Sequence, residues 1–328
     1  MARFVVLTSV FGPTPAVRRF AEQAPDRVIV VGDRKTPAGW SCPGVEYLSA
    51  DAQAASGWLT AGALPWNHYA RKMVGYLRAL ERGADTIAES DDDNLPSDGW
   101  SFPPFQGTFP EVAAGPHYNV YSRFTDRRVW PRGFPLSHVR EPAEVEESPR
   151  DCRVAVWQGL VDGDPDVDAI YRLTVGSPVS FNDGEPAVLA PGTVCPFNSQ
   201  NTLFRREAFP LLYLPATVSV RATDIVRGLV AQPVLWAAGM RLGFVGANAR
   251  QERNPHDLLR DFEDEIPLYL GAEAVSEAAA AAVSAEASVE ENLRRAYRRL
   301  AERALVGTEE LSLLDAWLGD VASLNGGG

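Results

Sequence analysis

Cysteine and histidine are scarce in this chain. Three cysteines and four histidines occur among its 328 residues. Cys42, Cys152 and Cys195 are odd in number, far apart and without a CxxC pair, which argues against a disulfide framework and against a zinc site built on thiolates. This cysteine usage fits a reducing, cytoplasmic location best.

Positive charge and long apolar runs are also lacking. The chain has 31 Lys and Arg against 43 Asp and Glu, a formal net charge of −12. Such a balance disfavours nucleic acid and anionic membranes as partners, although a local basic pocket can still hold a phosphate. The apolar run near the N-terminus is broken by Gly12 and Pro13, so we expect no membrane span and no signal peptide.

What the sequence does contain is an alternation of short strand patterns and helical patterns. Val- and Ile-rich runs at 3–10 and 26–33 flank a helical pattern at 15–23. A second helical pattern, 69–82, stops at a glycine and is followed by a strand pattern that ends at Ser90. This βαβ opening predicts an α/β fold in which polar loops meet beyond the carboxyl ends of the strands.

Three adjacent carboxylates, Asp91 to Asp93, follow the last of these strand patterns directly. Residues two apart on an extended segment point the same way, so Asp91 and Asp93 can share a face. Two hard oxygen ligands suit Mg²⁺ or Mn²⁺ far better than zinc, and a cation would offset the repulsion between them. The alternative is a solvated acidic turn, with Asn94 and Pro96 as turn residues.

The segment ARKMVGYLRALERGADTIAESDDDN, 70–94, resembles the signature of GT-A type glycosyltransferases. In that family a helix with a basic first turn and an internal glycine leads into a strand that ends in a DXD motif, whose carboxylates hold a divalent metal on the diphosphate of a nucleotide-sugar. Asp91 and Asp93 match these positions, which implies Mn²⁺ or Mg²⁺. Arg71 and Lys72 match the basic turn and either approach the nucleotide or are ordinary surface charges.

Further segments, in order, resemble the STELLO glycosyltransferase-like proteins over about residues 4–270. They are GDRKTP, WPRGFPL, QGLVDGDPDVDAIYRL, FNSQNTLF, RATDIVRG and QERNPHDLLRDFEDEIPLY. The resemblance implies a GT-A-like three-layer α/β/α (Rossmann-like) fold with a mixed central sheet, and metal-dependent transfer from a UDP- or GDP-sugar to a glycan or small-molecule acceptor. The sequence is also similar, more distantly, to the reversibly glycosylated polypeptides, which act as nucleotide-sugar mutases. Plant STELLO proteins are anchored in Golgi membranes, and we do not carry that location over.

Several polar residues at strand ends are expected to face the nucleotide. Asp33 follows a strand pattern, where a carboxylate can accept hydrogen bonds from a ribose or a base, and Arg34 beside it supplies positive charge. The alternative for Asp33 is an Asx turn. Thr8 and Ser9 follow the first strand pattern, and Asp92 lies between the two expected metal ligands.

Two later residues complete the expected site. In many GT-A enzymes a histidine late in the sequence completes the set of metal ligands, and His256 matches that position. The alternative is that His256 is a core or helix-terminal histidine with one hydrogen-bond partner. Asp224 precedes an apolar helical run. It is either the cap of that helix or the catalytic base that removes the proton of the acceptor hydroxyl.

Amides and indoles in the quoted segments suit a sugar. Asn198, Gln200 and Asn201 can hydrogen-bond to sugar hydroxyls, and Trp130 and Trp157 can form apolar platforms for a sugar ring. Roles in the core or at strand ends are open for all of them.

The predicted organisation is one GT-A-like domain over 1–270 and a helical extension over 271–328. Within the domain, 1–100 would be the nucleotide-binding half and 101–270 the acceptor-side half. Apolar positions of the extension, such as Leu293 and Tyr297, pack either on the core or on a second subunit, which leaves a homo-oligomer open. Besides a transferase, the sequence is compatible with a nucleotide-sugar mutase or with a non-catalytic nucleotide-sugar-binding accessory protein of a polysaccharide synthase.

Overall fold

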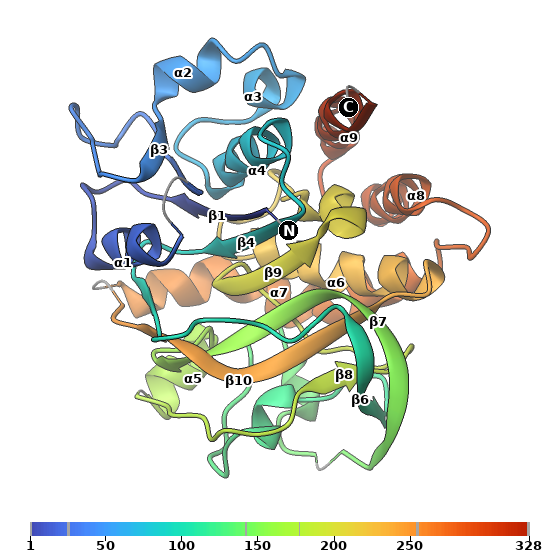
Figure 1. Cartoon of the computed structure of the whole chain (residues 1–328). Coiled ribbons are helices and arrows are strands. Elements are labelled where there is room, and N and C mark those ends of the chain that lie inside the picture. The colour runs from blue at the N-terminus through green and yellow to red at the C-terminus, as the bar shows by residue number, and fades with distance from the viewer. Residues whose placement is uncertain (1, 25–26, 142, 177, 254–255, 327–328) are drawn as a thin grey trace.

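The computed structural model describes residues 2–24, 27–141, 143–176, 178–253 and 256–326. They form a ten-stranded sheet with helices packed on it (Figure 1). The strands are β1 (Arg3–Thr8), β2 (Val28–Val31), β3 (Val45–Leu48), β4 (Thr86–Ser90), β5 (Asn94–Pro96), β6 (Gln106–Ala114), β7 (Val145–Gly163), β8 (Ala187–Leu189), β9 (Asn201–Arg205) and β10 (Arg241–Gln251).

In the first hundred residues the structure has helices at both predicted patterns, 15–23 and 69–82, and two short helices, at 50–54 and 59–63, that were not predicted. The α-helices are α1 (Pro15–Gln23), α2 (Ala50–Ala54), α3 (Leu59–Ala63), α4 (Lys72–Glu81), α5 (Ala169–Thr174), α6 (Thr223–Ala237), α7 (Leu258–Ala280), α8 (Val289–Glu302) and α9 (Glu310–Gly326). The 3₁₀ helices are η1 (Tyr69–Arg71), η2 (Val120–Arg123), η3 (Leu136–His138) and η4 (Arg206–Leu212).

Strands β3, β2, β1 and β4 lie in that order and are all parallel. The central strand β2 is buried along its whole length, as expected for a parallel sheet covered on both faces. Val6 on β1 packs on the face that α4 covers, whereas Val5 packs with Phe20 of α1 on the other face. The internal glycine of α4, Gly75, allows close helix–sheet packing, because a Cβ there would lie 2.5 Å from Val6 Cγ1.

The second half of the sheet is antiparallel and mixed. Strand β9 runs antiparallel to both β4 and β7 and so joins the two halves. The 19-residue strand β7 pairs with β6 through its first part and with β10 through its last part. Since β8 pairs with both β6 and β10, these four strands pair in a closed cycle, seen in the lower part of Figure 1. The predicted α/β class with a mixed central sheet is therefore confirmed.

The C-terminal part is helical, as predicted, and packs on the sheet domain. The predicted boundary at 270/271 falls within α7, and the division into 1–270 and 271–328 stays a prediction. Leu293 and Tyr297 on α8 are 2% and 0% exposed and belong to the main core, so these side chains pack on the same chain. Of the helices that the structure describes, none combines the length and apolar character needed to cross a bilayer.

The buried indole of Trp317 on α9 allows a test of how strongly this helix stabilises the fold. Its N–H donates to the carbonyl oxygen of Pro210 at 3.0 Å, and its ring meets that of Tyr76 on α4 edge to face. Because Trp317 is 0% exposed, we expect Trp317→Ala to lower the free energy of unfolding by about 3–5 kcal/mol in urea titrations. The control Leu270→Ala removes a side chain that is 83% exposed and should change it by less than about 0.5 kcal/mol. Equal stabilities of the two variants would contradict the packing of α9 on the core.

Candidate active site

A cavity of about 440 Å³ opens at the carboxyl ends of β1, β2 and β4. Most of the predicted site residues line it: Thr8, Ser9, Asp33, Arg71, Asp91, Asp92, Asp93, Asp224 and His256. Arg34 and Lys72 are not among its lining residues. Residues from both halves of the chain thus meet at one edge of the sheet.

The three adjacent carboxylates are held individually by the protein. Asp91 Oδ1 accepts hydrogen bonds from the Tyr69 hydroxyl at 2.8 Å and from Lys72 Nζ at 3.1 Å. The Asp92 carboxylate accepts a hydrogen bond from the Ser9 hydroxyl, and burial raises the pKa of Asp92. The following residues form the short strand β5 against β10. Asp92 and Asp93 do lie in a turn, but its carboxylates are hydrogen-bonded and partly buried rather than solvated.

Asp93 carries an oxygen that lacks a protein partner. Its Oδ2 accepts a hydrogen bond from Gln251 Nε2 at 2.9 Å, while its buried Oδ1 has no hydrogen-bond partner among the described residues. Burial first, and then the neighbouring Asp91 carboxylate, raise the pKa of Asp93 to about 6. An unpartnered buried carboxylate oxygen beside further carboxylates fits a hard divalent cation, which would satisfy the oxygen and offset the repulsion.

His256 lines the same cavity but faces a different carboxylate. Its Nδ1 lies 3.3 Å from Oδ2 of Asp261 on α7. Among the described residues, ligand atoms of His256, Asp91 and Asp93 do not all lie within 4.8 Å of one another. A metal role for His256 stays a prediction, because the contact of Nδ1 with Asp261 leaves Nε2 for a ligand.

The two basic residues of the predicted turn are buried, so neither is a solubilising surface charge. Arg71 donates to Gln53 Oε1 at 2.9 and 2.7 Å and lies 3.8 Å from the ring centroid of Trp66. Its pKa is lowered by burial. Lys72 is fully buried, and its Nζ donates a hydrogen bond to Asp91 Oδ1. Arg34, in contrast, is exposed, and its guanidinium carbon lies 4.7 Å from the centroid of the same Trp66 ring.

Asp224 does not cap α6, which corrects one of the two predicted alternatives. The N-cap position is Ala222, and Asp224 lies in the first turn of the helix. Its carboxylate pairs with Arg132 at 3.1 Å and accepts a hydrogen bond from the Ser199 N–H at 3.2 Å. Burial alone would raise the pKa of Asp224, but the positive charges of Arg132 and Arg227 outweigh burial and hold it below the ordinary value. The carboxylate is therefore ionised at neutral pH.

Sequence reasoning missed several charged residues that line the cavity. Arg132 lies between Asp224 and Asp166, and its Nε donates to Asp166 Oδ1 at 2.7 Å. Arg221 pairs with Glu265 at 2.6 Å, and burial lowers the pKa of Arg253 to about 10. These arginines all lie in the segments that resemble the STELLO proteins. That resemblance was the feature of the sequence from which they could have been predicted as site residues. Their convergence depends on contacts between distant segments.

The expected sugar platforms are core residues. Trp157 is 0% exposed and packs edge to face on Phe109, and Trp130 donates its indole N–H to Asp168. Neither indole lines the cavity. Of the three expected amides, Gln200 lines it, whereas Asn198 and Asn201 do not.

Comparison with known proteins bears on this site. The family model of the STELLO glycosyltransferases matches residues 221–326, which include Asp224, Arg253 and His256. Two Arabidopsis thaliana proteins, "Probable glycosyltransferase STELLO1" and "Probable glycosyltransferase STELLO2", are 32% and 33% identical over 259 residues, 72% of this chain and 34% of each relative. The resemblance to the STELLO family is confirmed. The chain spans about a third of the length of these STELLO proteins.

Solved structures with partial similarity include the Mycobacterium tuberculosis glucosyl-3-phosphoglycerate synthase. One such structure has a TM-score of 0.40 at 12% identity and covers 83% of this chain and 80% of that chain. Another, described as a complex with Mn²⁺ and uridine-diphosphate-glucose, has a TM-score of 0.39 at 12% identity, with coverages of 83% and 78%.

Proposed function

We propose that the protein is a GT-A type glycosyltransferase that binds a nucleotide-diphosphate sugar with Mn²⁺ or Mg²⁺ and transfers the sugar to a hydroxyl acceptor. The observation that carries the proposal is the buried Oδ1 of Asp93, which has no hydrogen-bond partner among the described residues. It lies beside Asp91, after β4, in a cavity that arginines also line. The similarity to the STELLO glycosyltransferases supports it.

Asp91 and Asp93 would hold the cation. When bound, the metal would neutralise the negative charge that the leaving nucleoside diphosphate develops. Lys72 and the Tyr69 hydroxyl hold the Asp91 carboxylate in a fixed orientation from behind. Gln251 does the same for Asp93. The carboxylates are thus oriented before a ligand arrives, so less conformational entropy is lost on binding.

The nucleotide side of the cavity would be formed by the first β-strands. Asp33 presents a carboxylate whose oxygens are engaged by the backbone N–H groups of Arg34 and His68, which fixes its orientation. Thr8 and Ser9 lie on the neighbouring strand end. Lys35, which is exposed, lines the same cavity and supplies a positive charge. We assign ribose or base recognition to Asp33, and contacts with the diphosphate to the basic residues that line the cavity, such as Lys35.

The acceptor side would be formed by Asp224 and the arginines. Asp224 is ionised and lies in the cavity, so it is our candidate for the group that takes the proton of the attacking hydroxyl. Its ion pair with Arg132 lowers its proton affinity, and a phosphate or carboxylate on the acceptor that drew Arg132 away would raise it. Arg221 and Arg253 provide further sites for an anionic substrate group.

A thermal-shift screen tests the proposed ligand class. UDP- and GDP-sugars are expected to raise the melting temperature of the protein in the presence of Mn²⁺ and much less in EDTA, because ligands stabilise the folded state to which they bind. Product analysis then separates transfer from the alternatives. Free nucleoside diphosphate with a glycosylated acceptor indicates transfer, an isomerised nucleotide-sugar indicates a mutase, and binding without either product indicates an accessory role. Absence of any metal-dependent shift across the screen would contradict the proposal.

A further inference from the structure

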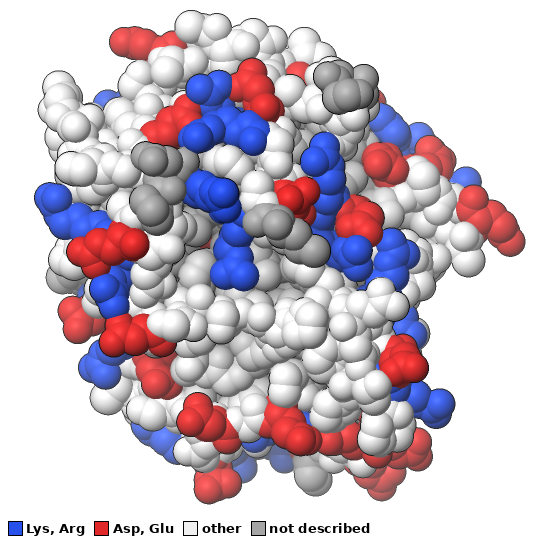
Figure 2. Space-filling model, viewed as in Figure 1, with Lys and Arg blue, Asp and Glu red and all other residues white. Residues whose placement is uncertain are grey.

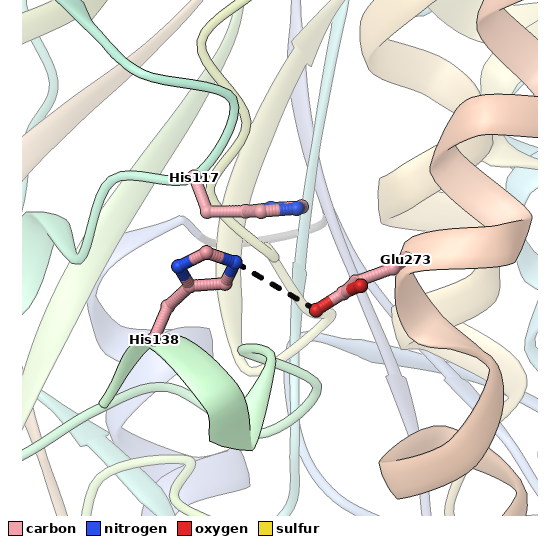
Figure 3. Close-up of side chains that lie close together, drawn as sticks. All are labelled: His117, His138 and Glu273. Carbon is pink, nitrogen blue, oxygen red and sulfur yellow. Dashed lines mark ion pairs between the residues drawn. The ribbon is translucent and has the colours of Figure 1, made fainter. Parts of the chain in front are cut away.

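Two histidines and a glutamate from distant parts of the chain meet away from the candidate active site. His117 lies after β6, His138 ends η3, and Glu273 lies on α7. One ligand atom from each lies within 4.8 Å of the other two, and no other such group of three occurs among the described residues. Figure 3 shows the two rings and the carboxylate pointing toward one another. None of the three lines the candidate active-site cavity.

The free ring nitrogens of both histidines are oriented for a ligand. His138 Nδ1 lies 2.9 Å from Oε2 of Glu141, which leaves Nε2 directed toward Glu273 Oε1 at 3.8 Å. A carboxylate on the far ring nitrogen is the usual way in which proteins orient a metal-binding histidine. His117 Nδ1 is buried and has no hydrogen-bond partner among the described residues. Burial lowers the pKa of His117, so its ring is neutral at pH 7, the form that binds metals.

The carboxylate is also held in place. Ser137 donates its hydroxyl to Glu273 Oε1 at 2.8 Å. The negative charge of Glu277, one turn further along α7, partly opposes the lowering of the His117 pKa. His117 and His138 line a second cavity, of about 900 Å³, which gives access from solvent and room for water ligands.

We propose that His117, His138 and Glu273 form a site for a divalent transition metal, Zn²⁺ in the first instance, distinct from the site at Asp91 and Asp93. Two imidazoles and one carboxylate form a ligand set that favours Zn²⁺ and its neighbours over Mg²⁺. In tetrahedral Zn²⁺ sites the ligand atoms lie roughly 3.3 Å apart. His138 and Glu273, whose side chains are 35% and 46% exposed and 3.8 Å apart, need to close by only about 0.5 Å, and no pair of the three by more than about 1.5 Å.

Such a metal would tie the segment that contains His117 and His138 to helix α7. The same helix carries Asp261 and Glu265, which pair with Arg253 and Arg221 at the candidate active site. Glu273 lies about two turns beyond Glu265. The site is therefore placed to fix the helix that positions these two arginines.

Calorimetric titration of Zn²⁺ into the metal-free full chain tests the site. We expect a single site in wild type, retained in Asp93→Asn, and weakened at least roughly a hundredfold in His138→Ala and in Glu273→Gln. Glu273 is exposed, so Glu273→Gln should fold even if the histidine variant does not. Glu141→Gln, which removes the carboxylate that orients His138, should weaken Zn²⁺ binding by roughly tenfold.

The matched control is Glu263→Gln, which neutralises an exposed glutamate on the same helix and should leave Zn²⁺ affinity unchanged. Co²⁺ in place of Zn²⁺ should show the visible absorption of a four- or five-coordinate site in wild type and in Glu263→Gln, and lose it in Glu273→Gln. Zn²⁺ binding that is absent from wild type, or that is equal in wild type, Glu273→Gln and His138→Ala, would overturn the proposal.

Discussion

Asp93→Asn is expected to weaken the complex of protein, Mn²⁺ and nucleoside diphosphate by at least roughly tenfold, about 1.4 kcal/mol. The substitution keeps the shape of the side chain and an acceptor for Gln251, but it removes the negative charge that a divalent cation needs. The neighbouring carboxylates also repel each other less in the variant, so the apo protein should be no less stable than wild type. Titration calorimetry with UDP or GDP, with and without Mn²⁺, measures the effect.

The control for this experiment is Asp98→Asn. Asp98 lies close in sequence, but its side chain is 93% exposed and pairs only at the surface, with Arg19. Its neutralisation should leave metal-dependent binding unchanged. If Asp93→Asn bound metal and nucleotide as wild type does, the assignment of Asp93 as a metal ligand would be lost.

Asp224→Asn is expected to lower turnover by a factor on the order of 10² to 10⁴ while metal-dependent nucleotide binding is kept. The amide preserves the shape and still accepts a hydrogen bond from Ser199, but it cannot take a proton. Since Asp224 is not the cap of α6, the variant tests chemistry without removing a cap. Steady-state rates with the donor that the thermal-shift screen identifies measure the effect.

Asp166→Asn separates the role of a base from that of an ion-pair partner. Asp166 and Asp224 both pair with Arg132, and the two carboxylate side chains are equally buried at 8% exposure. If Asp224 is the base, Asp166→Asn should reduce turnover much less than Asp224→Asn does. Equal losses in the two variants would show that Asp224 acts by positioning Arg132, and wild-type turnover in Asp224→Asn would remove it from the site.

The sequence was most informative where local pattern determines structure. The strand that ends at Ser90 and the carboxylates after it were predictable, because a short apolar run is followed directly by like charges that need compensation. Helix α1 was predicted with its observed bounds, and its first residue, Pro15, stands where proline is well tolerated. The segment around 100–150 gave no such signal. There β6 pairs with the first part of β7, residues 145–153, which depends on long-range pairing rather than on local periodicity.

Sites made of distant residues could not be predicted in the same way. Arg132 is 92 residues from Asp224, and only the folded sheet brings them together. His117 and Glu273 are farther apart still in sequence, and neither belongs to a metal-binding spacing pattern. The role of Trp157 was undecidable from composition, because an indole serves equally well in a core and in a sugar site.

The distribution of surface charge agrees with the composition. Of the described residues seen in Figure 2, basic and acidic side chains are interspersed, and no single sign of charge covers that face. The arginines that matter to the proposed function line the candidate cavity and are paired with carboxylates. Local positive charge is thus compatible with the net charge of −12 and suits a small anionic ligand rather than a polyanion.

The most direct test of the central claim is anomalous diffraction from crystals grown with Mn²⁺ and a nucleoside diphosphate. The account predicts an anomalous peak within coordination distance of both Asp91 and Asp93, with the diphosphate oxygens on the same ion and the nucleoside toward Asp33. A nucleotide bound in the cavity with no metal at these two carboxylates, or a metal and nucleotide bound together elsewhere, would contradict it.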